Sequence, residues 1–240
     1  MTCSDSQDIF QSWKKKSWEF LLSSQQSLKI NNPFHFSEEE AYLNILFHFI
    51  FYTSKQTMLE QEQIFQYALF ISMLLRSTLL FDEAFFIPIL QKKSKIALMQ
   101  ADLFLVQGGI AFSKLKNYKN CNTLLDQTLK TISENYVSSS PSNDLSCNSK
   151  LIAKRYGSIF YCSIAGIFLL DGIQQFNKKA YTALAEMLGL WVTVCHHSRI
   201  KLDVSSKNIN LLPSIQLQWM QWKMKFKKES EILRLNLLEL

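Results

Sequence analysis

Three acidic side chains stand where helices are expected to end or begin, and they are the residues of this chain best suited to chemistry. Asp82 and Glu83 close one long apolar segment, and Asp102 lies near the start of the next. Carboxylate oxygens are the ligands that Mg²⁺ prefers, and a site that uses this ion in catalysis gathers several of them. The next residues, up to Phe85 and Phe86, add no further carboxylate. The pattern therefore predicts an acidic helix end with too few oxygens to hold magnesium.

The histidines and cysteines give no stronger candidate. Cys195, His196 and His197 are adjacent, but no third or fourth ligand follows at a spacing that zinc sites use. His35 and His48 lie near the N-terminus without a zinc pattern. The sequence also contains no nucleophile elbow and no phosphate-binding loop. We therefore expect no metal bound by this chain and no catalytic residue of these classes.

Length and composition predict an all-α protein. The chain has 240 residues, of which 48% are hydrophobic, and it holds 18 phenylalanines but only 6 glycines and 4 prolines. Long apolar segments with few helix breakers favour helices over strands and turns. We expect a single domain at 1–240, with a docking segment at 1–36, a helical core at 37–203 and a closing loop and helix at 204–240. Helices are predicted at 37–52, 60–81, 94–116, 120–136, 150–174, 177–201 and 214–237.

Local signals refine this layout. The polar stretch 137–149 contains a proline and predicts a loop. Gly108 and Gly109 lie inside an expected helix, where glycine usually allows close helix packing and otherwise marks a kink. Asp171 is expected at a helix C-terminus, with a structural role.

The charge pattern argues against a nucleic-acid reader, and the cysteines favour a cytoplasmic chain. The net charge is +6, spread over small lysine groups at 14–16, 92–95 and 223–228 that are typical of solvated faces. The five cysteines form no Cys-x-x-Cys pair and no signal peptide is recognisable, so we expect free structural thiols in the cytoplasm. No apolar run reaches the roughly 18 to 20 uninterrupted residues of a membrane span. At most peripheral membrane contact is therefore expected.

The order of these segments resembles the all-helical trans-prenyl diphosphate synthases over roughly residues 37–203. In that family an Asp-rich cluster closes one helix, and here Asp82 and Glu83 stand at its place in the segment DEAFF. A Gly-Asp segment opens the family's next helix, and here KIALMQADLFL keeps Asp102 without the glycine. The resemblance implies an isoprenoid-synthase-like helical bundle with a degenerate first Asp-rich motif.

Two later segments extend the resemblance. The family's second Asp-rich motif corresponds to HHSRI, which holds His196, His197 and Arg199. Histidines and an arginine do not replace a carboxylate cage for magnesium. Residues 154–156, KRY, lie near the family's Lys-Thr-Ala position, which contacts the substrate diphosphate. The resemblance therefore implies that both metal-binding walls have lost their ligands.

Some bacterial long-chain prenyl synthases are heterodimers, and this chain resembles their smaller subunit, which lacks the Asp-rich motifs (component 1 of heptaprenyl diphosphate synthase). The resemblance implies a non-catalytic subunit, required for the activity and product length of its partner in menaquinone side-chain synthesis. The partner subunit would bind Mg²⁺ and the prenyl diphosphates, and this chain would pack against it through apolar helices. Phe81, Phe85, Phe86 and Phe104 are candidates for the tunnel floor or the interface, with plain core packing as their alternative role.

Two other functions remain open from the sequence. A diverged stand-alone prenyltransferase or terpene synthase would use Asp82, Glu83 and Asp102 to bind magnesium without a partner. A helical interaction adaptor unrelated to isoprenoids is the second, although no internal repeat of the kind that builds helical scaffolds is present. The tryptophan-rich C-terminal helix is a candidate contact for a partner or for a membrane surface.

Overall fold

The computed structural model describes residues 10–16, 18–19, 37–86, 92–138, 145–200 and 211–234. The other residues, and the side chains at several helix ends, lie outside the described part. The elements, in chain order, are α2 Ser37–Ser54, α3 Gln61–Phe86, α4 Lys92–Ser113, the short 3₁₀ helix η1 Tyr118–Cys121, α5 Asn122–Ser138, α6 Leu145–Leu170, α7 Lys178–Ile200, α8 Leu211–Lys225 and α9 Lys227–Ile232. All the described elements are helices, so the predicted all-α class is confirmed.

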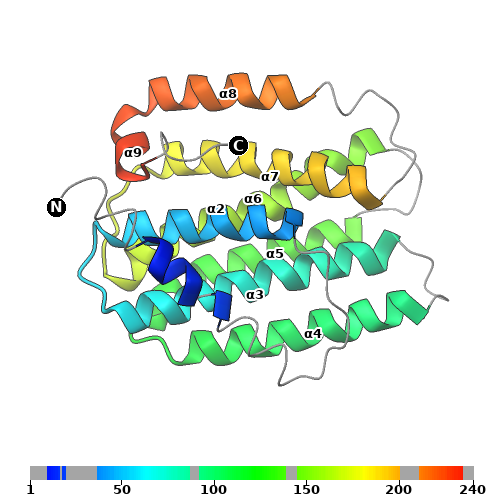
Figure 1. The fold of residues 1–240 in the computed structure, drawn as a ribbon, viewed down its shortest axis with the longest axis horizontal. Helices are drawn as coiled ribbons and strands as arrows, with labels where there is room; N and C mark the ends of the chain where they lie inside the picture. The colour runs from blue at the N-terminus through cyan, green and yellow to red at the C-terminus, as the bar shows by residue number, and fades with distance from the viewer. Residues whose placement is uncertain are drawn as a thin grey trace.

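The long helices lie side by side in a bundle with α3 and α6 near its centre (Figure 1). α3 is apolar on nearly every side, and residues such as Tyr67, Ile71 and Leu75 are completely buried. A helix that is hydrophobic all round belongs in a core rather than on a surface. α4 packs on the outer side of α3, and α8 packs on α7, so α4 and α8 lie at opposite edges of the view.

Glycines bring neighbouring helices into close contact, as Gly189 and Gly108 show. A Cβ atom at Gly189 in α7 would lie 2.0 Å from the carbonyl oxygen of Ala153 in α6, so only glycine lets the two backbones approach this far. At Gly108 in α4 a Cβ would lie 3.2 Å from the Cβ of Met73 in α3. At Gly109 no atom of the described residues lies within 4 Å of that position. The prediction of close packing is therefore confirmed for Gly108 and wrong for Gly109.

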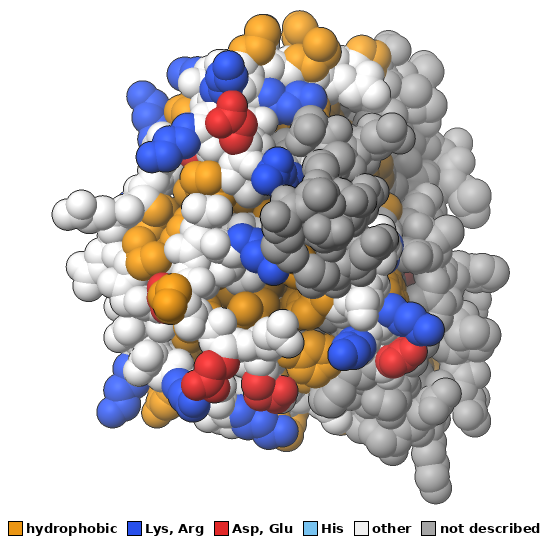
Figure 2. All heavy atoms as spheres, turned by 60° about the vertical axis from the view of Figure 1, so that its left-hand side comes forward, with side chains coloured by type: hydrophobic (Ala, Val, Ile, Leu, Met, Phe, Trp, Pro, Cys, Tyr) orange, Lys and Arg blue, Asp and Glu red, His pale blue; other side chains and the backbone are white. Residues whose placement is uncertain are grey.

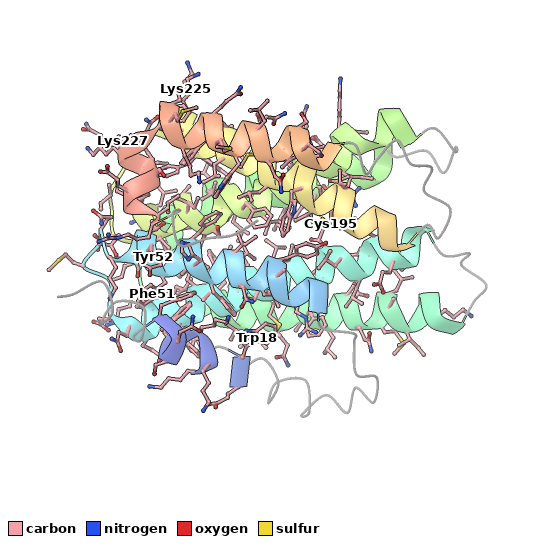
Figure 3. The ribbon with its side chains drawn as sticks, turned by 45° about the horizontal axis from the view of Figure 1, so that its top comes forward. Trp18, Phe51, Tyr52, Cys195, Lys225 and Lys227 are labelled. Atoms are coloured by element: carbon pink, nitrogen blue, oxygen red, sulfur yellow. The ribbon has the colours of Figure 1, made fainter. Side chains whose placement is uncertain are left out.

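The described part of the N-terminal segment contacts α2. Phe10 lies 5.3 Å from Phe51 and 5.9 Å from Tyr52, measured between ring centroids. Trp13 meets the Phe47 ring edge-on at 5.5 Å. Figure 3 shows Phe51 and Tyr52 beside this segment. The helical residues 10–16 therefore cover an aromatic face of α2.

The observed helices extend beyond the predicted ends in two regions, because polar residues there are also helical. α3 continues to Phe86 instead of ending near 81, so Asp82 and Glu83 lie within the helix rather than after it. The predicted loop at 137–149 is shorter, because α5 reaches Ser138 and α6 already begins at Leu145. Asp171 does follow the last residue of α6, where its Oδ2 accepts a hydrogen bond of 3.1 Å from the Met58 backbone N–H.

The prediction of one closing helix at 214–237 is wrong. α8 ends at Lys225, and Phe226 leaves the helical conformation with φ −117° and ψ 56° before α9 begins. The break turns the chain back onto the bundle, where Asn177 Nδ2 donates to Glu229 Oε1 at 2.8 Å. His48 Nε2 donates to the Leu233 carbonyl oxygen at 2.7 Å. A straight helix would lose both hydrogen bonds, which explains why the chain bends.

Two helices of the described chain, within residues 61–84 and 95–113, are long and apolar enough to cross a membrane. The sequence prediction concerned uninterrupted apolar runs, and scattered polar residues interrupt these two segments without making them polar on average. The first helix is 89% buried in the bundle, as expected of a core helix, whereas the second is 39% buried. This property is weak support for a membrane span, but it shows that α4 carries more apolar surface than the bundle covers.

Candidate functional site

Asp82, the first acid of the degenerate motif, lies inside the bundle and is paired with α6. Its carboxyl group is fully buried, and Oδ1 accepts a hydrogen bond from the Arg155 guanidinium in an ion pair. Oδ2 accepts a hydrogen bond of 2.5 Å from the Tyr156 hydroxyl. Arg155 and Tyr156 are themselves almost completely buried. Both carboxylate oxygens are therefore occupied by donors of the protein itself.

Helix geometry explains why this carboxylate is inside. Residues three and seven positions apart share a helix face, so Asp82 lies on the same face as the buried Leu79 and Leu75. Removing one partner from a buried ion pair leaves an uncompensated charge, which typically costs about 3–5 kcal/mol. A buried acid on this face therefore requires a cation on the facing helix, and Arg155 supplies it.

The sequence did not predict this pairing. The resemblance places residues 154–156 near a diphosphate-contacting position, not opposite Asp82. The available signal was an arginine and a tyrosine directly before the apolar run GSIFYCSIAGIFLL, where each would need a polar partner.

The three candidate acids are not gathered into a metal site. Asp82 is buried, Glu83 is half-buried, and Asp102 is exposed on α4. Mg²⁺ demands a nearly octahedral shell of oxygens, whereas the cation beside Asp82 is a guanidinium. Within the described residues, no group of three or more His, Cys, Asp or Glu side chains could hold a metal ion.

The segment predicted to be a second degenerate motif lies at the end of α7. His196, His197 and Arg199 belong to the last turns of this helix, but their side chains lie outside the described part. Figure 1 shows the C-terminal ends of α3 and α7 at the same end of the bundle. The two segments that would carry opposing metal-binding walls thus lie at one end of the fold.

The predicted tunnel residues have different environments. Phe104 is completely buried, and the Arg76 guanidinium lies over its ring at 4.6 Å from the centroid. Phe81 is partly buried against the core. The side chains of Phe85 and Phe86 lie outside the described part. In this chain Phe104 is a core residue, and a tunnel or interface role for the others stays a prediction.

The buried cysteines contribute no reactive thiol. Burial raises the pKa of Cys121 to about 12, and it also raises the pKa of Cys162. Tyr67 donates a hydrogen bond of 2.6 Å to the Cys162 carbonyl oxygen. None of the three described cysteines, Cys121, Cys162 and Cys195, forms a disulfide bond. Because the thiolate is the nucleophile, thiols that stay protonated at neutral pH are structural.

The uncovered side of α4 is the second unusual region, and we call it the α4 face. Its most exposed apolar residues, each more than half accessible, are Met99, Val106 and Ile110. Ile96, Leu98 and Leu105 extend it and are more than a third accessible. In the described part of α4, the exposed charges are Lys95 and Asp102. Asp102 lies three residues after Met99 and four before Val106, so it shares their face. An exposed apolar helix face with few charges is typical of a surface that another protein covers.

Comparison of the chain with protein-family models, with curated proteins and with solved structures finds no match in any of the three.

Proposed function

We propose that this chain is the non-catalytic subunit of a heterodimeric long-chain trans-polyprenyl (heptaprenyl) diphosphate synthase with an isoprenoid-synthase-like fold. The observation that carries this proposal is the burial of Asp82 against Arg155 and Tyr156. In a catalytic prenyl synthase the corresponding helix end must hold magnesium and the substrate diphosphate. Here the same position is closed by a cation of the chain itself, so the metal and the chemistry belong to a partner.

The arrangement of helices supports the same proposal. The chain has the helix order that the sequence resemblance implies: a long apolar helix with acids in its last turns is followed by a second apolar helix that packs against it. The ends of α3 and α7 lie at one end of the bundle (Figure 1), as two walls of a former site would.

The α4 face is the surface that we assign to the catalytic partner. Fully burying one large aliphatic side chain stabilises an association by about 1.5–3 kcal/mol before the cost of ordering. Met99, Val106 and Ile110 together therefore offer enough apolar area to anchor a helix of another subunit. The low charge of this face suits the core of a protein interface, from which charged residues are depleted.

The direct test is a reconstitution assay with farnesyl diphosphate, isopentenyl diphosphate and Mg²⁺. The partner to use is a synthase subunit that carries both Asp-rich motifs and is encoded next to this chain. We expect no product from this chain alone, and a long-chain product only when both proteins are present. Product formed by this chain alone, or a partner whose activity and product length do not change when this chain is added, would contradict the proposal.

A second measurement separates the proposal from a stand-alone enzyme. The thermal unfolding midpoint of the isolated chain is measured with and without Mg²⁺ and inorganic pyrophosphate. A protein that binds the metal–diphosphate pair is stabilised by mass action, so a stand-alone synthase would unfold several degrees higher. We expect no shift, because Arg155 already occupies the acidic end of α3.

A further inference from the structure

α8 exposes an apolar ridge, which we call the α8 crest. It consists of Leu217, Met220 and Met224, each more than half accessible and spaced three and four residues apart on one side of the helix. The opposite side is fixed to the body, because Trp219 and Trp222 are buried and Trp222 Nε1 donates to the Ala180 carbonyl oxygen at 2.8 Å. The crest therefore faces away from the bundle, and Figure 2 shows hydrophobic side chains along the upper edge of the molecule, with lysine and arginine side chains nearby.

Lysines surround the end of this crest. Lys223, Lys225, Lys227 and Lys228 lie in the last turn of α8 and the first turn of α9. Figure 3 shows Lys225 and Lys227 at the junction of the two helices, pointing outward. Of the two acids in α9, Glu229 is buried and bonded to Asn177, which leaves Glu231 as the exposed one. The surface around the crest is thus clearly positive.

A cavity of about 600 Å³ lies beside the crest, between α6, α7 and α8. Its apolar lining includes Met187, Leu190, Trp222 and Phe226. Lys150, Lys154 and Lys225 also line it, and the carboxylate among its lining residues is Glu186. Helix-end lysines such as Lys225 favour the negative end of the helix dipole, but this does not explain the two lysines that α6 adds. Three cations around an apolar floor suit an anionic group attached to an apolar chain.

We propose that the α8 crest, the lysines around it and this lysine-lined cavity dock the chain on an anionic phospholipid bilayer. The crest enters the boundary between headgroups and acyl chains, and the cavity takes the phosphate headgroup of one lipid. An amphipathic helix with an apolar ridge and lysines on its flanks binds such interfaces by apolar burial and by attraction to anionic lipids. A protein partner is less well matched, because lysines are depleted from protein interfaces and both tryptophans of α8 are turned inward. This inference does not depend on the proposed synthase role.

The test is co-sedimentation of the full chain with vesicles of pure phosphatidylcholine and with vesicles that also contain phosphatidylglycerol. We expect binding to the anionic vesicles, at least tenfold weaker binding to the neutral ones, and release by high salt because exposed charges are screened. K225E/K227E and M220Q/M224Q should each weaken binding about tenfold or more, while circular dichroism and the unfolding midpoint stay close to the wild-type values. K150Q/K154Q removes the α6 side of the cavity and should reduce the preference for the anionic vesicles.

Two controls decide whether the site or the net charge is responsible. K114E/K119E makes the same charge change at exposed positions after α4, and V106Q/I110Q makes the same polar change on the α4 face. Neither should weaken vesicle binding by more than about twofold, since neither side chain pair borders the crest. Absence of binding to anionic vesicles at low salt would overturn the proposal. Equal losses for both charge-reversal pairs would do the same. So would crest variants that keep vesicle binding and lose a protein partner instead.

Discussion

Two regions of the molecule depart from the usual distribution of side chains, and they do so in opposite ways. One is the junction of α3 and α6, and the other is the outer side of α4. At the junction, a carboxylate and a guanidinium are buried where apolar residues are expected. On the α4 face, methionine, valine and isoleucine are exposed where polar residues are expected. The first inversion is satisfied within the chain, because Asp82, Arg155 and Tyr156 bond to one another. The second is not satisfied by any described residue.

This difference indicates where function resides. A buried polar group that already has partners needs no ligand. Exposing an apolar helix face to water costs free energy, and a molecule that covers the face removes this cost. The buried pair in the interior is therefore structural, and we propose that the outer helices are the parts that contact other molecules. The same reasoning applies to α8, whose exposed ridge ends in a group of lysines, whereas the α4 face carries Asp102 among its apolar residues.

The largest expected effect comes from breaking the interior pair. Arg155→Met leaves the Asp82 carboxylate buried without its cation, so we expect a loss of about 3–5 kcal/mol in the free energy of unfolding. The double variant Asp82→Leu/Arg155→Met removes both charges and should recover most of that loss. Urea denaturation followed by circular dichroism measures both variants. An Arg155→Met protein as stable as wild type, with a new affinity for Mg²⁺, would show that Asp82 is a ligand rather than a structural group.

His48 is a second buried polar residue, and it should make the stability of the chain depend on pH. Burial lowers the pKa of His48 from its ordinary value of 6.5 to about 4 in the folded chain. The unfolded chain therefore binds the proton more tightly, so the stability contributed by His48 is complete above pH 6.5 and is lost as the pH falls toward 4. The maximum loss is about 3 kcal/mol, from roughly 1.4 kcal/mol per unit of pKa difference.

The same experiment has a matched control in His48→Gln. A glutamine amide can donate to the Leu233 carbonyl oxygen but does not titrate, so the variant should show a flatter dependence of stability on pH between 4 and 6.5. Denaturant midpoints measured across this range give the comparison. Identical pH profiles for both proteins would mean that His48 binds its proton as readily in the folded chain as in the unfolded one.

The exposed side of the comparison is tested on α4. V106K/I110K places two charges on the α4 face, and we expect the affinity for the catalytic partner to fall by about 10–100-fold, or roughly 1.5–3 kcal/mol. The stability of the isolated chain should stay within about 0.5 kcal/mol, because both residues are more than half exposed. Size-exclusion chromatography of the mixed subunits measures the complex. L217K/M220K is the matched control on α8 and should leave the complex intact.

The fold could be predicted further than the site. Long apolar segments and few breakers were enough for the all-α class and for the approximate position of each long helix. The break at Phe226 could not be predicted, because it depends on hydrogen bonds from Asn177 and His48, which are distant in sequence. The predicted end of α3 is too early for a similar reason. An acid after an apolar run indicates a helix end, although a cation on another helix allows Asp82 to remain inside.

The site was predicted from residue types but not from their pairing. Sequence reasoning placed Asp82 in a degenerate Asp-rich motif and residues 154–156 near a diphosphate-contacting position. Only the packing of α3 on α6 shows that the two segments bond to each other. The exposure of individual side chains could not be predicted either, because Val106 and Phe104 are both apolar residues of the same predicted helix. The first is mostly exposed and the second is completely buried.

The smallest effect is expected within α4, where Gly109 is exposed and Gly108 packs against α3. Gly109→Ala adds a methyl group where no atom of the described residues lies within 4 Å, so the isolated chain should gain about 0.5–1 kcal/mol from helix propensity. Gly108→Ala is the control, since its Cβ would press on Met73 at 3.2 Å and should offset part or all of that gain. Thermal unfolding of the two variants gives the difference. If a partner helix packs against α4 at Gly109, the variant that stabilises the free chain should also weaken the complex, because the added methyl group then occupies space that the partner needs.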